Sequence, residues 1–246
     1  MTCEADWWVP SGKYGLPLTP SGDSCRTSRH ALAQIAKVRP AVFITSVARE
    51  IARYNNLAAN AQALNITLSH HVLARSKAEI LHLVEQLIDE TSSRIELTNL
   101  LVDVMDIVLH CVDHNHLKNK SLSEIFPPIC LFPQISHSVQ ARRIAVGTRS
   151  GQLALYEMRT SKVQTLPGAH GGGPVLATAY SPDGKHLSTY SAADNRLHFW
   201  QTSTGMFGLG NAQTKCNRSY NTPPLASNVQ WNTPSYTPKL VWISAR

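Results

Sequence analysis

Histidines at the spacing of metal ligands are the first candidates for chemistry in this sequence. His110 and His114 stand four residues apart, which would place two imidazoles on one face of a helix. No glutamate follows His110, so the HExxH pattern of zinc proteases is missing. Both histidines fall where the predicted helix ends, and an imidazole there interacts favourably with the helix dipole. We therefore expect a capping role and no metal site, with a zinc enzyme using this pair as the enzymatic alternative.

Other signatures of catalysis are missing from the sequence. The glycine-rich run Gly168–Pro174 lacks the Lys-Ser/Thr pair with which phosphate-binding loops reach phosphates and magnesium. No GxSxG nucleophile elbow occurs, and the five cysteines form no CxxC pair. The odd number and irregular spacing of the cysteines suit free thiols in a reducing compartment. The sequence therefore predicts no catalytic residue, no cofactor and no enzyme activity.

The elements that would position any site differ between two parts of the chain. Residues 1–24 are rich in proline and glycine, which predicts an irregular lead. Residues 25–130 carry apolar residues at steps of three and four, which predicts amphipathic helices joined by short loops. Capping boxes at Ser76–Glu79 and Ser121–Glu124 are expected to begin two of these helices. Paired helices of this kind are typical of HEAT or armadillo folds, so we expect a HEAT-like segment, although a generic helical bundle gives the same stripes.

Beyond the helical segment the apolar period changes to that of β-strands. Residues 144–148 follow a period of two, and residues 175–180 form a second strand pattern. The latter leads into Ser181–Lys185, the signature of a type I or type II turn. Tyr156 and Trp200 stand in corresponding strands 44 residues apart. A repeat of ~40–45 residues with four strands in each unit is typical of β-propeller blades.

The same stretch resembles a WD repeat. Ser181–Lys185 is followed by Asp194 and, six residues later, by Trp200, which matches the family's order of turn, aspartate and tryptophan. The family's Trp-Asp pair appears here as Tyr156-Glu157 in the first unit and Trp200-Gln201 in the second. The resemblance implies an α+β chain in which the HEAT-like helices precede a partial WD-repeat β-propeller of about two antiparallel blades, over residues 141–246.

The resemblance also implies a buried hydrogen-bond network that stiffens the second blade and has no catalytic role. Its members would be His170, Ser191 (with Thr189 as the alternative), Asp194 and Trp200. The family's Gly-His pair appears here as Ala169-His170. In the first blade the corresponding places hold Ser150 and Tyr156, so an incomplete network is expected there.

Longer stretches resemble one WD-repeat family in particular, that of WD repeat-containing protein seven, the rabconnectin beta chain. These stretches are Ala48–Asn55, His71–Arg75, Val104–Cys111 and Phe199–Gly208, and the resemblance covers about Arg26 to Tyr220. It implies a non-enzymatic scaffold that is cytoplasmic and peripheral on synaptic or endolysosomal vesicles. The implied partners are a DmX-like alpha chain, subunits of the vacuolar proton pump and regulators of Rab GTPases. The implied role is support of proton pump assembly and of Rab GTPase regulation.

Positive charge is concentrated in the second part of the chain. The formal net charge is +7, and residues 141–246 contain 11 Lys+Arg against 3 Asp+Glu. Such an excess favours an acidic partner, so a basic adaptor that binds anionic lipid or RNA through residues 142–218 is the alternative function. The basic residues are spread and no known nucleic-acid module is evident, so we expect no nucleic-acid partner. A solvated surface with charge-protected sheet edges explains them equally.

Composition and length bound what remains. A hydrophobic content of 43% with 16% charged residues argues against a wholly disordered chain. The N-terminus lacks the features of a secretory signal, and the apolar stretch over residues 97–112 is too short and too interrupted for a span of ~20 residues. Propellers need at least about four blades, whereas residues 141–246 hold little more than two. We therefore expect the 246-residue chain to be a fragment, a short isoform or an incomplete gene product that pairs with the remaining blades or a partner.

Overall fold

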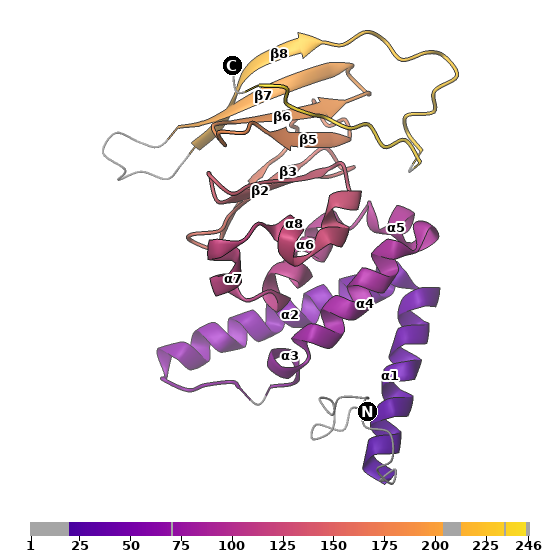
Figure 1. Cartoon of the computed structure of the whole chain (residues 1–246), viewed down its shortest axis with the longest axis vertical. Coiled ribbons are helices and arrows are strands. Elements are labelled where there is room, and N and C mark those ends of the chain that lie inside the picture. The colour runs from indigo at the N-terminus through magenta and orange to yellow at the C-terminus, as the bar shows by residue number, and fades with distance from the viewer. Residues whose placement is uncertain (1–19, 70, 204–212, 234, 245–246) are drawn as a thin grey trace. The chain divides into compact units, whose positions relative to one another are not determined.

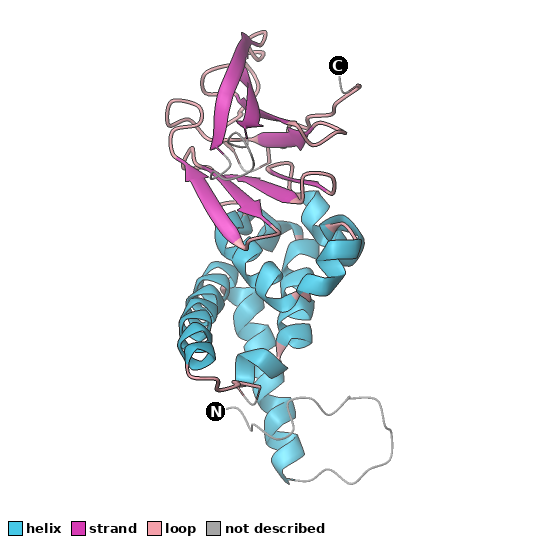
Figure 2. Cartoon of the chain, turned by 90° about the vertical axis from the view of Figure 1, so that its left-hand side faces the viewer, coloured by secondary structure: helices cyan, strands magenta, loops and turns pink. Residues whose placement is uncertain are grey.

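The chain combines helices with antiparallel sheets. The computed structural model describes residues 20–69, 71–203, 213–233 and 235–244. Within these residues there are eight α-helices and two four-stranded antiparallel sheets (Figure 1 and Figure 2). The chain divides into two compact units, Met1–Asp113 and His114–Arg246. The irregular lead expected over residues 1–24 lies outside the described residues, apart from the start of a helix at Pro20.

Six helices make up the described part of the first unit. They are α1 (Pro20–Val38), α2 (Pro40–Ala63), α3 (Val72–Arg75), α4 (Lys77–Asp89), α5 (Thr91–Leu97) and α6 (Leu101–Cys111). Pro40 occupies the first turn of α2, where its missing N–H is not needed. Among the described residues no single helix is long and apolar enough to cross a membrane. Arg26–Val38 and Pro40–Ala63 satisfy length and composition only when taken together, and they are bent by 118°.

Apolar stripes hold the first unit together. Helix α6 packs against both α2 and α4. The buried side chains of these helices recur at helical spacing, with several adjacent residues also buried: Phe43, Ile44 and Ile51 on α2, Ile80, Val84, Leu87 and Ile88 on α4, and Leu101, Val104, Met105, Ile107 and Val108 on α6. Burying one such side chain contributes about 1.5–3 kcal/mol. These stripes therefore stabilise the helices far more than their termini do.

The second unit begins with short helices and continues into two sheets. The helical elements are α7 (His114–Asn119), α8 (Leu122–Ile125) and the 3-10 helix η1 (Pro127–Leu131). The first sheet contains β1 (Ile135–Ser138), β2 (Arg143–Gly147), β3 (Leu153–Glu157) and β4 (Lys162–Leu166). The second sheet contains β5 (Ala177–Tyr180), β6 (His186–Ser191), β7 (Arg196–Ser203) and β8 (Gln213–Asn221). Each sheet is an antiparallel meander, with its strands side by side in chain order.

Helices α4 and α8 begin where the sequence predicts, directly after Ser76 and Ser121, but neither serine makes the side-chain bond of a capping box, so that part of the prediction was wrong. The hydroxyl of Ser76 donates to Val72 O instead of accepting from α4, because Ser76 is also the C-cap of α3. Glu79 forms an ion pair with Arg29 of α1 at 3.4 Å. Ser121 precedes α8 but makes no side-chain cap, and its hydroxyl lies 3.0 Å from that of a neighbouring serine. Because the neighbouring helices are short and close together, each serine hydroxyl has a nearer partner than the free backbone N–H groups of the helix that follows it.

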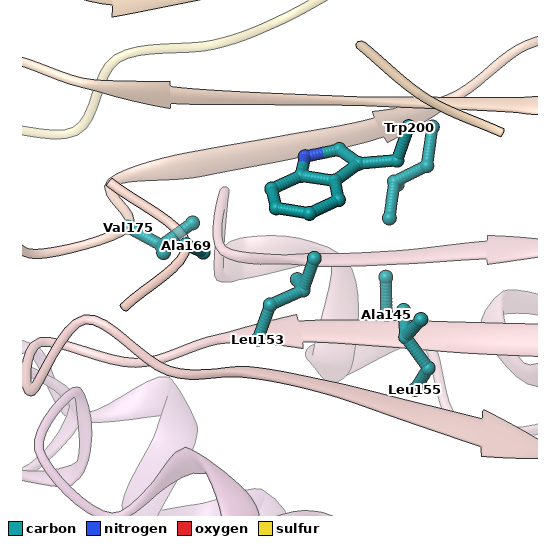
Figure 3. Packing of buried hydrophobic residues seen from close by; sticks show 7 residues of the cluster. Ala145, Leu153, Leu155, Ala169, Val175 and Trp200 are labelled. Atoms are coloured by element: carbon teal, nitrogen blue, oxygen red, sulfur yellow. The ribbon is translucent and has the colours of Figure 1, made fainter. Parts of the chain in front are cut away.

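The two sheets pack together through one face of each. In the register of β6 and β7, Leu187 lies opposite Trp200 and Tyr190 lies opposite Leu197, so the two pairs point to opposite faces of the second sheet. Figure 3 shows the Trp200 face packed on the first sheet. This core cluster consists of Ala145, Leu153, Leu155, Ala169, Val175, Leu187 and Trp200. The second sheet therefore has another apolar face, the one that carries Tyr190 and Leu197.

Close approach of backbone fixes the loop that leads into β5. Gly151, in the turn between β2 and β3, has a φ of +81°, and a Cβ there would lie 2.8 Å from the carbonyl carbon of Gly172. Ala169 N donates to Gly151 O at 3.0 Å, and Val175 N donates to Thr148 O at 2.9 Å. The β2–β3 turn therefore holds the loop between β4 and β5 in place.

This close approach predicts a difference between two glycine substitutions. Gly151 and Gly171 have φ values of +81° and +61°, and only at Gly151 would a new Cβ meet backbone. Positive φ alone costs a side chain on the order of 1–3 kcal/mol. Gly151→Ala is expected to lose about 1–3 kcal/mol more than Gly171→Ala, because the neighbouring backbone must shift. Chemical denaturation of both variants measures the difference, and equal midpoints would show that the contact does not constrain the fold.

Candidate functional site

Four polar side chains meet on the face of the second sheet that packs on the first. Thr189 lies on β6, Trp200 on β7 and Asp194 in the turn between them, while His170 lies in the loop between β4 and β5. The turn is tight, since Asn195 has a φ of 49° and Asp194 Oδ1 accepts a backbone N–H of the turn at 3.1 Å. The β6–β7 hairpin therefore positions Thr189, Asp194 and Trp200. The loop between β4 and β5, which the β2–β3 turn holds in place, positions His170.

The four side chains form one continuous hydrogen-bond chain. Trp200 Nε1 donates to Thr189 Oγ1 at 2.9 Å. Thr189 Oγ1 lies 2.9 Å from His170 Nε2, and His170 Nδ1 lies 3.1 Å from Asp194 Oδ2. An indole can only donate and an ionised carboxylate can only accept. For a neutral His170 the direction is thus fixed: Thr189 donates to Nε2, and the proton on Nδ1 is donated to Asp194.

The hydroxyl in this chain is that of Thr189 and not that of Ser191. Ser191 Oγ accepts the backbone N–H of Ala193 at 3.2 Å instead, at the end of β6. The structure brings the other three expected residues, His170, Asp194 and Trp200, together around Thr189. Thr189 and Ser191 point to the same face of β6, so alternation alone does not choose between them. The choice depends on how far the Trp200 ring reaches across the strand pair.

The Asp194–His170–Thr189 order is that of a catalytic triad, but its surroundings exclude catalysis at this hydroxyl. Thr189 is 0% exposed and His170 is 2% exposed. The Thr189 oxygen already accepts from Trp200, so the position where a substrate carbon would approach is filled by protein. A buried network of this kind, with every group satisfied, stiffens the strands that it joins.

Burial lowers the pKa of His170, with the nearby His198 acting in the same direction. Asp194 and the hydrogen bonds of the ring oppose this effect but do not overcome it. The ring of His198 stacks on that of His170, with 4.1 Å between centroids and 13° between planes. His198 Nδ1 donates to Ala169 O at 2.8 Å, which holds the second ring parallel to the first. Because the pKa of His170 is lowered from 6.5, the neutral ring is its main form at neutral pH.

The described residues hold one group that could ligate a metal ion, and it is this same group. Ligand atoms of His170, Asp194 and His198 all lie within 4.8 Å of one another. Both nitrogens of His170 are already engaged, by Thr189 and by Asp194. The stacked rings also direct their nitrogen lone pairs side by side and not toward a common point, since lone pairs lie in the ring planes. The arrangement therefore fits hydrogen bonding and not a zinc site.

The histidine pair singled out in the helical segment does not share a helix. Helix α6 ends at Cys111 and α7 begins at His114, so the spacing of four residues from His110 does not correspond to one helix face. The His110 ring meets Tyr54 edge-on at 5.4 Å between centroids. Burial, followed by the positive charge of Lys77, lowers the pKa of His110 to about 4. His110 is therefore a neutral side chain in the core of the first unit at neutral pH.

The basic residues of the second unit are used in two different ways. Arg143 pairs with Glu157 across β2 and β3 at 2.9 Å, and Arg149 donates to backbone carbonyls within the unit. Ten others among the described residues of this unit lie exposed: Lys118, Lys120, Arg142, Arg159, Lys162, Lys185, Arg196, Lys215, Arg218 and Lys239. Only the exposed set is available to an acidic partner.

Comparison with known proteins gives a distant likeness. No family model matches the chain. Among solved structures, the chain is similar to the β-propeller domain of Cps50 (Swd1) from Myceliophteria thermophila, with 15% sequence identity and a TM-score of 0.30. The match covers 35% of this chain and 27% of that chain.

The hydrogen-bond chain predicts unequal effects for its two candidate hydroxyls. Thr189→Val keeps the shape of the side chain but leaves Trp200 Nε1 and His170 Nε2 buried without partners. The expected loss is about 2–4 kcal/mol in the free energy of unfolding. Ser191→Ala removes one bond from a backbone N–H and is expected to cost about 1 kcal/mol or less. Urea denaturation followed by Trp fluorescence measures both, and similar losses would contradict the role given to Thr189.

The low pKa of His110 predicts acid sensitivity of the first unit. Between its ordinary value of 6.5 and about 4, the unfolded chain binds a proton that the folded chain does not. Stability from this group is therefore full above pH ~7 and falls as the pH drops through that window. His110→Gln should flatten this part of the stability profile, measured by circular dichroism at 222 nm in denaturant. His82→Gln, at a side chain that is 61% exposed, is the control. An unchanged profile in His110→Gln would contradict the assignment.

Proposed function

We propose that the chain is a non-enzymatic WD-repeat scaffold whose two sheets act as blades of a partial β-propeller. The observation that carries this proposal is the buried chain from Trp200 through Thr189 and His170 to Asp194. It joins a loop, two strands and a turn into one rigid piece, and it offers no access for a substrate. A rigid meander of four strands presents its turns and its outer strand, β4 or β8, as binding surface.

The first unit contributes packing surface in the same proposal. We assign it as a HEAT-like segment, in which helices stack on neighbouring helices through apolar faces. Near the junction of α1 and α2, Ile35, Val38 and Val42 are 54%, 72% and 57% exposed. Apolar side chains grouped in this way suit contact with another helical element.

The partners in this proposal come from the resemblance of the sequence to the rabconnectin beta-chain family. They are a DmX-like alpha chain, subunits of the vacuolar proton pump and regulators of Rab GTPases. The complex would lie in the cytoplasm, peripherally on synaptic or endolysosomal vesicles, and would support assembly of the pump. The scaffold holds these proteins together by surface contact, without a chemical step of its own.

A basic adaptor for anionic lipid or RNA is the second candidate function. One observation favours it: a hollow in the second unit is lined by Lys118, Lys120, Arg142 and Arg143. Arg143 is partly neutralised by Glu157, with 2.9 Å between Nε and Oε2. The remaining cations attract phosphate groups mainly through long-range charge, so binding would weaken steeply as salt rises.

One capture experiment separates the two functions. The full chain is immobilised and exposed to nuclease-treated vesicle extract, alongside the variant Lys118→Gln/Lys120→Gln/Arg142→Gln. The scaffold proposal predicts recovery of the alpha chain or pump subunits by both proteins, with little change in high salt. Circular dichroism of each protein verifies folding.

Two outcomes would overturn the scaffold proposal. Folded chain that recovers neither partner contradicts the assignment of partners. Capture that is lost in the triple variant, together with heparin retention that weakens steeply as salt rises, assigns the chain as a basic adaptor.

A further inference from the structure

The second face of the second sheet is covered by a later segment of the chain. This face, which carries Tyr190 and Leu197, belongs to a buried cluster with Leu176, Ala177 and Ala192. Residues 222–233 and 235–244, here called the strap, follow β8 and run across it (Figure 1). The side chains of the strap that pack on the cluster are Leu225, Trp231, Tyr236 and Leu240. The strap thus covers this face as the first sheet covers the opposite one.

The strap lies on the face as an extended chain without joining the sheet. Its side chains alternate between partly buried and exposed from Tyr236 to Ile243. Such alternation is that of an extended strand with one face down. No strand ladder is formed by the described strap residues, and none of them is fully buried. The strap is therefore held by alternate side chains that pack on this face and by a few polar contacts.

Three of the polar contacts are made to backbone carbonyls, and a fourth joins the side chains of Tyr190 and Tyr236. Arg149, from the β2–β3 turn, donates through Nη1 to Asn232 O at 3.0 Å and through Nη2 to Thr233 O at 2.9 Å. Its Nε is buried without a hydrogen-bond partner, so the Nε–H group is free to donate to a further acceptor. Trp242 Nε1 donates to Ala179 O of β5 at 3.0 Å. Any extended chain offers carbonyls to an arginine in this way.

We propose that this face of the second sheet is a binding surface for an extended peptide with apolar or aromatic side chains at alternate positions, and that the strap occupies it as an internal competitor. This inference rests on the scaffold function proposed above and names the class of partner. The strap itself defines the recognition: carbonyls beside Arg149, and large apolar side chains that reach Tyr190, Leu197 and their neighbours. A partner segment of the same kind binds when it displaces the strap.

The covalent attachment of the strap to β8 explains why the strap covers this face in the free chain. An attached segment acts at a high effective concentration, which short flexible linkers raise to about the millimolar range. A free peptide of equal affinity therefore competes poorly until the strap is weakened. Loss of one large anchor from the strap should shift this competition by about tenfold or more, and this makes the inference measurable.

The experiment uses the full chain and a labelled synthetic peptide of residues 222–244, with fluorescence anisotropy as the readout. Trp231→Ala in the chain weakens the strap and is expected to tighten binding of the wild-type peptide about tenfold or more. Val241→Ala, at a strap side chain that is 71% exposed, is the matched control and should leave the affinity unchanged. Adding Arg149→Gln to Trp231→Ala should weaken the peptide again, because its carbonyls lose their donor.

Hydrogen exchange of the strap amides in Trp231→Ala shows that the strap has loosened. Equal peptide affinity in wild type and Trp231→Ala, or no binding by a chain with a loosened strap, would overturn the inference. Insensitivity to Arg149→Gln would also overturn it. Recovery of the protein partners by a chain that fails to bind the peptide would contradict this inference alone. Peptide binding without recovery of those partners would contradict only the proposed partners.

Discussion

The second unit depends on a hydroxyl that water cannot reach. Thr189 Oγ1 accepts from Trp200 and lies 2.9 Å from His170 Nε2, and neither partner has an alternative within its buried surroundings. A buried donor or acceptor without a partner costs about 1–3 kcal/mol, so the four groups must be satisfied together or not at all. This requirement holds the loop before β5 and the β6–β7 turn in place around Thr189. The surfaces proposed for binding are built on the elements that it fixes.

The two faces of the second sheet then have different roles. The Trp200 face is packed on the first sheet through the buried core cluster. The Tyr190 face is covered by a strap whose side chains are all at least partly exposed. Packing of the first kind makes a rigid platform, and packing of the second kind can be exchanged for a partner. The proposed scaffold function would use both properties.

The sequence predicted those parts of the fold that depend on local chemistry. The turn at Ser181–Lys185 follows from its turn residues, whereas the grouping of His170, Asp194 and Trp200 was implied by the resemblance to a WD repeat. The network uses Thr189 and not Ser191 because of how far the Trp200 ring extends across β6 and β7. The spacing of residues along the sequence does not determine that distance. Strand β8 was missed because eight of its nine residues are exposed, so it has no apolar period. The strap was missed for a different reason, since its contacts are to a face that only the folded sheet creates.

The protonation of His170 tests the central claim most directly. Nitrogen-detected NMR of the full chain, with the resonance assigned by its loss in His170→Gln, reports which ring nitrogen holds the proton at neutral pH. The hydrogen-bond chain predicts a neutral ring with the proton on Nδ1, donated to Asp194, and a Trp200 indole N–H protected from exchange. A proton on Nε2, a charged ring, or a Trp200 N–H that exchanges as fast as an exposed indole would contradict the account.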